Sequence, residues 1–460
     1  MKTSRCELHR SVHKLPSIRF EDQEMTSFSG LVLFQKLFAS LRLRERLHRC
    51  VRHLESRSCY GPTTVLLWLV VHLVLGWRSL RDLVHYQGDP LVLRVLGLRR
   101  LPTVPTVCRE LQRMGAGVVQ RLRRLLRDLV VERLKSLGTR SITLDFDGSV
   151  FSTKSRKKEG TAVGFNRKSK GSHSYYPLFA TVAQTDQVFD VLHRPGNVHD
   201  SRDALPFVQR CFQHLRQKGL KGPMEARLDS AHFSDETCFW LFDQGIQFTI
   251  SVPFERFPQL KRKIQERQRW TSIDDTWSCF EGDWCPKKWE DARGHRRFRL
   301  LLFRQRVKTP KKGPIQLDLF QPVDTHYEYT AVITNKPHSA HAVLHFHHGR
   351  GSQEHLFGEI KSQGNLGYLP TRRQVGNEIY TLCSALACNL QRELLMRATK
   401  PQRSNALKRH CLWVFDTLGS FRKALVQRAG RLTRPNGDLA LTVALNNLAA
   451  TDFMHYLKAA

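Results

Sequence analysis

The sequence is short of acidic residues, of closely paired cysteines and of long apolar runs. Its 41 aspartates and glutamates face 74 lysines and arginines, which gives a formal net charge of +33. So large an excess repels itself in a compact protein unless a polyanion offsets it. The composition therefore favours nucleic acid as the partner, bound with an affinity that falls steeply as salt is added.

The one strong apolar run, Val65 to Leu75, is too short to span a bilayer and contains His72, so we expect a buried helix. The N-terminus is basic but lacks the continuous apolar core of a signal peptide. The eleven cysteines show no repeated Cys-x-x-Cys spacing, which predicts reduced, mostly buried thiols in a cytoplasm. A zinc site made of Cys279, Cys285 and His295 is the alternative for these residues.

A chain of 460 residues is longer than a domain with a single hydrophobic core usually is, so we expect several domains. Residues 1–138 carry apolar residues at helical intervals and form the expected helical, DNA-binding N-terminal region. One short helix there carries Arg109 and Arg113 after a turn, and it either enters a DNA groove as in helix-turn-helix proteins or packs as one more helix. The arginines of the next helix, residues 118–137, either contact phosphates or are simply solvated.

At residue 141 the pattern changes from helical to extended. Residues 141–149 are rich in β-branched side chains and end on acidic ones, with Asp145 and Asp147 on one face of the strand. Two carboxylates at the end of a buried strand are costly unless they are paired or bind a cation. This strand therefore predicts a polar site at its end.

The following segments predict an α/β domain over residues 139–252. Strands are expected at residues 176–183 and 188–192, then a helix at 201–215, a strand at 223–228, a helix at 235–241 and a strand at 247–252. Ribonuclease-H-like domains share this order. Asp147 and Asp229 would then lie at strand ends of one sheet, where such sheets build their sites.

Residues 253–335 combine four tryptophans with basic clusters and predict a β-rich insertion domain, with extended segments at 298–307 and 327–334. Trp284 and Trp289 are candidates for stacking on unpaired DNA bases, although tryptophans at this density are more often part of a core. The second part of the catalytic core is expected at residues 336–400, and a mostly helical C-terminal region at 401–460.

A helix predicted over residues 347–361 places charges of both signs on one face. Arg350, Glu354 and Lys361 fall within roughly 60° of one another around its axis, with His347 beside them. The adjoining apolar stripe would pack on a core and direct Glu354 at a metal ion or a phosphate. A solvated Arg350–Glu354 pair is the alternative.

We expect three carboxylates to lie close together, those of Asp147, Asp229 and Glu354. Phosphodiester transfer uses such a set because two divalent ions about 4 Å apart must be held by oxygen ligands. Mg²⁺ is the expected ion. Asp145 is the alternative to Asp147 as the first acid.

These motifs together resemble a DDE transposase of a bacterial insertion sequence, in the group with a β insert before the last acid. That group carries Tyr-x2-Arg-x3-Glu-x6-Lys, which Arg350, Glu354 and Lys361 match in register, with His347 in the tyrosine's place. Asp147-Gly148-Ser149 resembles the first acid of the family, and Asp229 within residues 227–233 resembles the second. Residues 164–166, 176–178 and 194–197 are also similar to stretches of such transposases.

The resemblance implies an enzyme that binds terminal inverted repeats, pairs two ends as a homodimer in a synaptic complex, and performs cut-and-paste transposition. Mg²⁺, for which Mn²⁺ substitutes, would be held by Asp147, Asp229 and Glu354. The resemblance also implies a DNA hairpin intermediate, target DNA as a second partner, and a cytoplasmic protein associated with the nucleoid when bound. The expected DNA contacts come from residues in four parts of the chain: His347, Arg350 and Lys361; Arg109 and Arg113; Lys168 and Lys170; Trp284 and Trp289.

Two other functions remain open at the level of the sequence. A metal-dependent nuclease on the same scaffold would cut DNA without joining it. A non-catalytic repressor derived from a transposase would bind DNA ends without any dependence on Mg²⁺.

Overall fold

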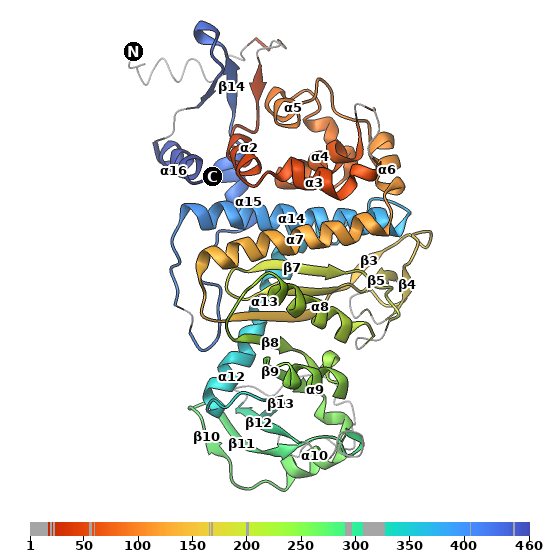
Figure 1. Ribbon diagram of the computed structural model, residues 1–460, viewed down its shortest axis with the longest axis vertical. Coiled ribbons are helices and arrows are strands. Elements are labelled where there is room, and N and C mark those ends of the chain that lie inside the picture. The colour runs from red at the N-terminus through yellow and green to blue at the C-terminus, as the bar shows by residue number, and fades with distance from the viewer. Residues whose placement is uncertain are drawn as a thin grey trace.

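The computed structural model describes residues 17, 18, 21, 24–54, 58, 60–164, 166, 169–198, 202–289, 297–306, 327–404, 406–444 and 447–460. The molecule is elongated, with a helical tier at one end and a large sheet that extends to the other (Figure 1). Two long helices lie across the molecule between the two parts. The chain is therefore a mixed α/β protein built around one extended sheet.

The helical tier holds α2 (Leu31–Ser40), α3 (Leu43–Val51), α4 (Pro62–Val74), α5 (Pro90–Leu96) and α6 (Val104–Arg113). Every residue of α4 is buried, including His72. A helix that is apolar on all sides belongs in a core, and its proline at the first helical position starts it without losing a hydrogen bond. The prediction of a buried helix in this segment is confirmed.

The two long helices are α7 (Ala116–Leu137) and α14 (Gln374–Ala398). They lie side by side, and α14 packs on α4 above and on the edge of the sheet below (Figure 1). Gly138, in the left-handed conformation, ends α7 as expected from the sequence. These helices join the core of the helical tier to that of the sheet.

The central part of the sheet contains β2 (Ile142–Gly148), β6 (Leu178–Val182), β7 (Gln187–Leu192), β8 (Met224–Leu228) and β9 (Gln247–Val252), in the order β7-β6-β2-β8-β9. β2, β8 and β9 are parallel, whereas β6 and β7 are antiparallel to their neighbours. The helices α8 (Ala204–Gln217) and α9 (Asp235–Asp243) connect the later strands. This is the order of elements predicted from the sequence.

Four further strands continue the same sheet beyond β9. They are β10 (Thr271–Ser272), β11 (Trp277–Trp284), β12 (Phe298–Arg306) and β13 (Tyr327–Thr334), and β13 pairs antiparallel with β9. Within the described residues the sheet thus has nine strands. The segment expected to be a β-rich insert is β-rich, and its strands extend the sheet of the core.

The two faces of the central sheet carry different side chains. Phe146 packs on Phe207 and Phe212 of α8, so this face is apolar. The alternate residues of β2, which include Asp145 and Asp147, point to the face covered by α12 (Ala340–His348) and α13 (Ser352–Ser362). The polar site therefore lies between the sheet and these two helices.

The C-terminal residues return to the helical tier. β14 (Gly430–Thr433) pairs with β15 (Ala440–Val443) and with β1 (Met25–Thr26) near the start of the chain. α16 (Asn447–Ala459) packs on α14 and α2, and the short α15 (Leu418–Phe421) lies near α14. Two small strand pairings, of β3 (Phe151–Thr153) and β4 (Ala162–Val163) with β5 (His173–Tyr175), complete the fold.

Candidate active site

Asp147 lies at the end of β2, where the strand leaves the core. It pairs with Phe179 of β6 in the sheet, and its side chain is 18% exposed. The amide of Gly148 donates a hydrogen bond of 2.8 Å to its Oδ1, which fixes the carboxylate. Its Oδ2 faces the guanidinium of Arg350. Asp147 is therefore held in place and still accessible.

Asp229 directly follows β8, the parallel neighbour of β2. Its Oδ1 accepts hydrogen bonds from the amide of Ala231, at 3.1 Å, and from the ring of His232, at 2.8 Å. Burial opposes ionisation, but the hydrogen bond from His232 and the positive charges of His232 and Arg350 hold the pKa of Asp229 below its usual value. Asp229 is thus kept ionised.

The two aspartates influence each other because the carboxyl ends of parallel strands meet at one edge of the sheet. Burial and the negative charge of Asp229 raise the pKa of Asp147 to about 6, even though Arg350 acts in the opposite direction. Like charges held close together disfavour the ionised form. This pair therefore has the electrostatic character of a cation site, and its hard oxygen donors suit a divalent ion.

Asp145, the alternative first acid, is used inside the protein. It is buried and forms a two-pronged ion pair with Arg227 of β8, with Nη2 2.6 Å from Oδ2. Burial raises its pKa and the charge of Arg227 opposes the rise. A carboxylate occupied in this way offers no oxygen to a metal, so the geometry favours Asp147.

The helix predicted over residues 347–361 is interrupted. α12 ends at His348, a 3-10 turn spans Gly349–Gly351, and α13 begins at Ser352. A Cβ atom on Gly349 would lie 2.0 Å from Nη1 of Arg227 and 2.0 Å from the carbonyl oxygen of Lys408, so no larger residue fits there. The turn brings Nη1 of Arg350 to 3.6 Å from Oδ2 of Asp147.

The expectation that His347 shares the exposed charged face is wrong. His347 is buried, and its ring nitrogens lie 3.0 Å from Oγ1 of Thr249 and 2.8 Å from Oγ of Ser251, both on β9. Burial, aided by Arg350, lowers its pKa to about 3, so the ring is neutral near pH 7. It anchors α12 to the sheet and cannot serve as a cation for DNA.

Glu354 stands in the first turn of α13 with its side chain exposed. Two contacts place this helix along the end of β2: Gln353 donates to the carbonyl of Asp145 at 3.1 Å, and Lys361 donates to that of Val150 at 3.4 Å. The structure therefore puts Glu354 on the element that borders the aspartates. Within the described residues, however, no three His, Cys, Asp or Glu side chains are grouped closely enough to hold one metal ion.

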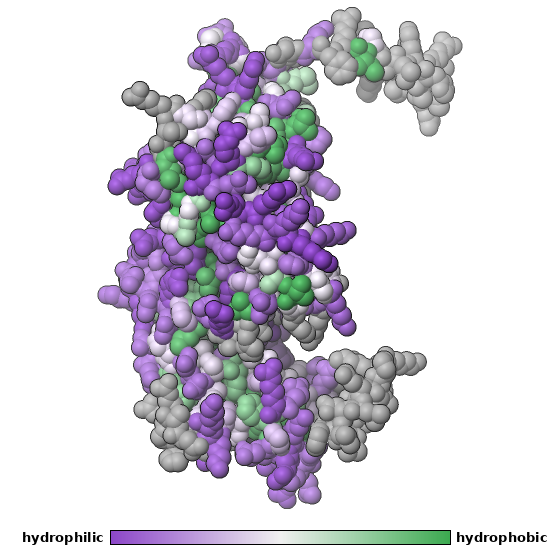
Figure 2. Space-filling model, turned by 90° about the vertical axis from the view of Figure 1, so that its right-hand side faces the viewer, coloured by the Kyte–Doolittle hydropathy of each residue, from purple (hydrophilic) through white to green (hydrophobic). Residues whose placement is uncertain are grey.

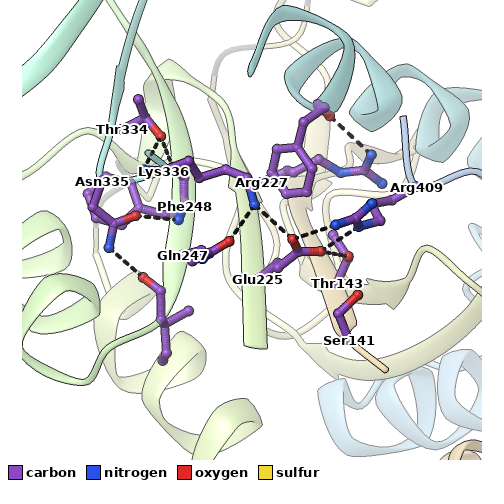
Figure 3. A network of polar contacts seen from close by, with 12 residues as sticks. Ser141, Thr143, Glu225, Arg227, Gln247, Phe248, Thr334, Asn335, Lys336 and Arg409 are labelled. Carbon is purple, nitrogen blue, oxygen red and sulfur yellow. Dashed lines mark hydrogen bonds and ion pairs between the residues drawn. The ribbon is translucent and has the colours of Figure 1, made fainter. Parts of the chain in front are cut away.

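A buried polar network surrounds Glu225 on β8, the strand that leads to Asp229 (Figure 3). Glu225 of β8 accepts hydrogen bonds from Lys336 at 2.7 Å, from Thr143 at 2.6 Å and from Arg409 at 2.9 and 3.1 Å. Arg409 comes from the segment that follows α14, and the preceding carbonyl, of Lys408, accepts a hydrogen bond from Arg227 at 2.7 Å. The segment after α14 is thus tied to the strands that carry the aspartates.

Trp284 and Trp289 lie in the core, which contradicts the expectation that their rings are open to stacking on DNA bases. Trp284 is 6% exposed and Trp289 is 9% exposed. Both stack on Phe233, with ring centroids 6.4 and 4.6 Å away, respectively. They instead pack the end of the sheet against the segment that follows Asp229.

The other predicted DNA contacts are exposed where the structure describes them. Arg109 and Arg113 lie on the exposed side of α6, and Arg113 pairs with Glu110 at 2.8 Å. Lys170 is exposed at the turn before β5, whereas Lys168 lies outside the described residues. Figure 2 shows the side of the molecule that carries α6 and β4, where hydrophilic residues cover most of the face.

The zinc alternative has little support in the described part of the chain. Cys279 and Cys285 are buried, and burial raises the pKa of the Cys279 thiol. His295 lies outside the described residues. A buried thiol with a raised pKa is a poor metal ligand, because the thiolate is the form that binds.

Two residues of the site were not singled out from the sequence. His232 holds Asp229, and its place three residues after an acid at a strand end is a signal that could have identified it. Arg227 neutralises Asp145 from the neighbouring strand, a relationship that depends on the pairing of β2 with β8. No local pattern reveals that pairing.

Comparisons with known proteins identify the family of this chain. The family model described as "Transposase DDE domain group 1" matches residues 11–444. The chain therefore belongs to the DDE transposase domain group 1 family. Members of this family generally use divalent metal ions.

One solved structure that matches is the cryo-EM structure of the piggyBac transposase synaptic complex with hairpin DNA. The match covers 79% of this chain and 74% of that chain, at 11% sequence identity and a TM-score of 0.40. The comparison with curated proteins found no match. In the part of the chain that the structure describes, no helix has the length and apolar character needed to cross a membrane.

Proposed function

We propose that the protein is a cut-and-paste DNA transposase whose catalytic acids are Asp147, Asp229 and Glu354. The observation that carries the proposal is that Asp147 and Asp229 lie at the ends of neighbouring parallel strands, where the charge of Asp229 raises the pKa of Asp147. A divalent cation would relieve this repulsion. We choose Mg²⁺, with Mn²⁺ able to replace it, because every proposed ligand is a carboxylate oxygen.

The residues present fit such a metal site in part. Asp147 and Asp229 provide two partly exposed carboxylates, and Glu354 provides a third from the helix that borders them. A bound pair of divalent ions supplies activation of the attacking oxygen and stabilisation of the leaving oxygen in phosphodiester transfer. The order of the five central strands agrees with a ribonuclease-H-like scaffold for this chemistry.

The cations around the acids would position the DNA. Arg350 lies 3.6 Å from Asp147, and its guanidinium can also donate to a phosphate beside the acids. Lys361, seven residues after Glu354 on α13, is exposed on the same helix and would contact the backbone further along. His232 would keep Asp229 ionised and oriented throughout the reaction.

By this proposal, a homodimer pairs two terminal inverted repeats of a bacterial insertion sequence. Each end is cut by water, and the freed 3′ hydroxyl attacks the opposite strand to form a hairpin. After water opens the hairpin, the 3′ hydroxyl attacks target DNA. Each phosphodiester bond is therefore broken either by water or by a 3′ hydroxyl that forms a new phosphodiester bond. No protein nucleophile is required.

The experiment is incubation of the purified protein with a labelled duplex carrying its element's end, with Mg²⁺ or with EDTA, resolved on a denaturing gel. We expect breaks at the end that need Mg²⁺ and are lost in Asp147→Asn and Glu354→Gln, while both variants still shift the duplex in a native gel. Asp283→Asn, which removes an exposed carboxylate from β11, is the matched control and should cut normally. Intact DNA despite binding would indicate a non-catalytic binder, and cutting without joining would indicate a nuclease.

A further inference from the structure

Two adjoining clefts in the helical tier are lined by arginines that the proposed catalytic site does not use. The first, of about 840 Å³, lies between α3 and the first turn of α4. The second, of about 420 Å³, lies between α3, α7 and Lys218, which follows α8. Arg46 and Arg49 line both clefts, so they form one continuous surface. We call this surface the α3 cleft.

The α3 cleft has a surplus of positive charge. Seven cations and three carboxylates line it: Arg42, Arg44, Arg46, Arg49, Arg121, Arg124 and Lys218, against Glu45, Asp128 and Glu132. Two of the carboxylates are already neutralised, because Glu132 pairs with Arg46 at 2.7 Å and Asp128 pairs with Lys218 at 2.8 Å. Among the described residues, no ion pair involves the exposed side chains of Arg42, Arg49 and Arg124.

The cleft is also a fixed surface. The guanidinium of Arg121 donates a 2.6 Å hydrogen bond to the carbonyl of Cys50, which lies in the last turn of α3. This bond joins α3 to α7. The pair of Arg46 with Glu132 joins the same two helices a second time. The exposed arginines therefore project from a rigid base, which limits the entropy lost when they bind a ligand.

Arg42 is held in an unusual backbone conformation. It has φ 49° and ψ 41° in the left-handed region, just before the first residue of α3. Glycine adopts this conformation without strain and arginine does not, so strain of this kind marks a position where the side chain itself can matter. The side chain of Arg42 lines the α3 cleft.

We propose that the α3 cleft binds the phosphate backbone of duplex DNA, with Arg42, Arg49 and Arg124 as its phosphate contacts. Guanidinium groups match phosphate oxygens in geometry, and contacts of this kind set the position of a protein on DNA without reading its sequence. The net charge of +33 favours a polyanion over an acidic protein surface. The inference rests on the proposed function, and it assigns a backbone contact to α3 in addition to α6 and α7.

The test measures the salt dependence of binding to a labelled duplex by fluorescence anisotropy, in EDTA so that no cleavage occurs. The variant Arg42→Gly removes a cation and relaxes the backbone, so its thermal stability should be unchanged or higher. The triple variant, which adds Arg49→Ala and Arg124→Ala to Arg42→Gly, should reduce the magnitude of the slope of log K against log salt by about three. Each lost phosphate contact lowers this magnitude by about one.

The matched control removes three exposed cations elsewhere, with Arg262→Ala, Lys263→Ala and Arg269→Ala in and just after α10 (Pro258–Gln265). We expect this control to change the slope far less than the cleft variant. An unchanged slope in the cleft variant, or an equal loss in both, would overturn the proposal. Because the readout needs neither metal nor Asp147, a failure here is distinguishable from a failure to cleave.

Discussion

Arg227 and Asp145 form an ion pair inside the sheet, with Nη2 of the arginine 2.6 Å from Oδ2 of the aspartate. Neither side chain is exposed to solvent. The same guanidinium donates to the carbonyls of Phe346 and Lys408, so it also connects α12 and the segment after α14 to β2. The next residue on the same face of β2 is Asp147, which Arg350 approaches to 3.6 Å while 18% of the aspartate side chain stays exposed.

The first prediction concerns this pair. Arg227→Leu leaves the carboxylate of Asp145 buried and unpaired, and breaking a buried pair in this way should lower the free energy of unfolding by about 3–5 kcal/mol. Urea unfolding followed by circular dichroism measures the change. The double variant Arg227→Leu with Asp145→Leu should be more stable than the single one, because no uncompensated charge remains.

An equal loss in the two variants would contradict this account of the pair. It would mean that the hydrogen bonds from Arg227 to Phe346 and Lys408, which both variants lack, carry the stabilisation.

Asp147→Asn gives a further contrast. This substitution removes a negative charge that the charge of Asp229 repels. The free energy of unfolding of the variant should therefore be equal to that of the wild type or higher in EDTA.

Local patterns in the sequence predicted much of the fold but little of the site's surroundings. The bounds of β9 and β13 agree with the prediction because alternation along a strand is visible in the sequence alone. The break at Gly349 could not be predicted, since it depends on Arg227 and Lys408 approaching from distant parts of the chain. His347 is buried for the same kind of reason: its hydrogen-bond partners lie on β9.

The second prediction concerns the pH dependence of stability and the network around Glu225. Burial opposes ionisation of this side chain, but hydrogen bonds and charges from Arg409 and Lys336 lower its pKa to about 2. A carboxylate with a lowered pKa stabilises the fold above the pKa of the unfolded state, near 4.5, and this stabilisation is lost as the pH falls toward 2. The free energy of unfolding should therefore fall between pH 4.5 and pH 2.

Glu225→Gln is the variant that isolates this contribution. It should be less stable than the wild type at pH 6, and the difference should shrink as the pH falls, because glutamine has no proton to take up. Urea unfolding at pH 6, 4 and 3 measures both proteins under the same conditions. A difference that stays constant over this range would show that the network does not depend on the charge of Glu225.

The third prediction follows from the position of Trp289 in the core. Its ring stacks on Phe233 at 4.6 Å and meets Phe239 edge to face at 6.4 Å, so Trp289→Ala should lower the free energy of unfolding by about 3–5 kcal/mol. Trp289→Phe, which keeps an aromatic ring, should lose less. DNA binding by the folded fraction should be unchanged in both, as measured by anisotropy well below the unfolding transition. If Trp289→Ala instead kept full stability and lost only the hairpin product, the ring would be a base-stacking residue after all, and the sheet would have to open to expose it.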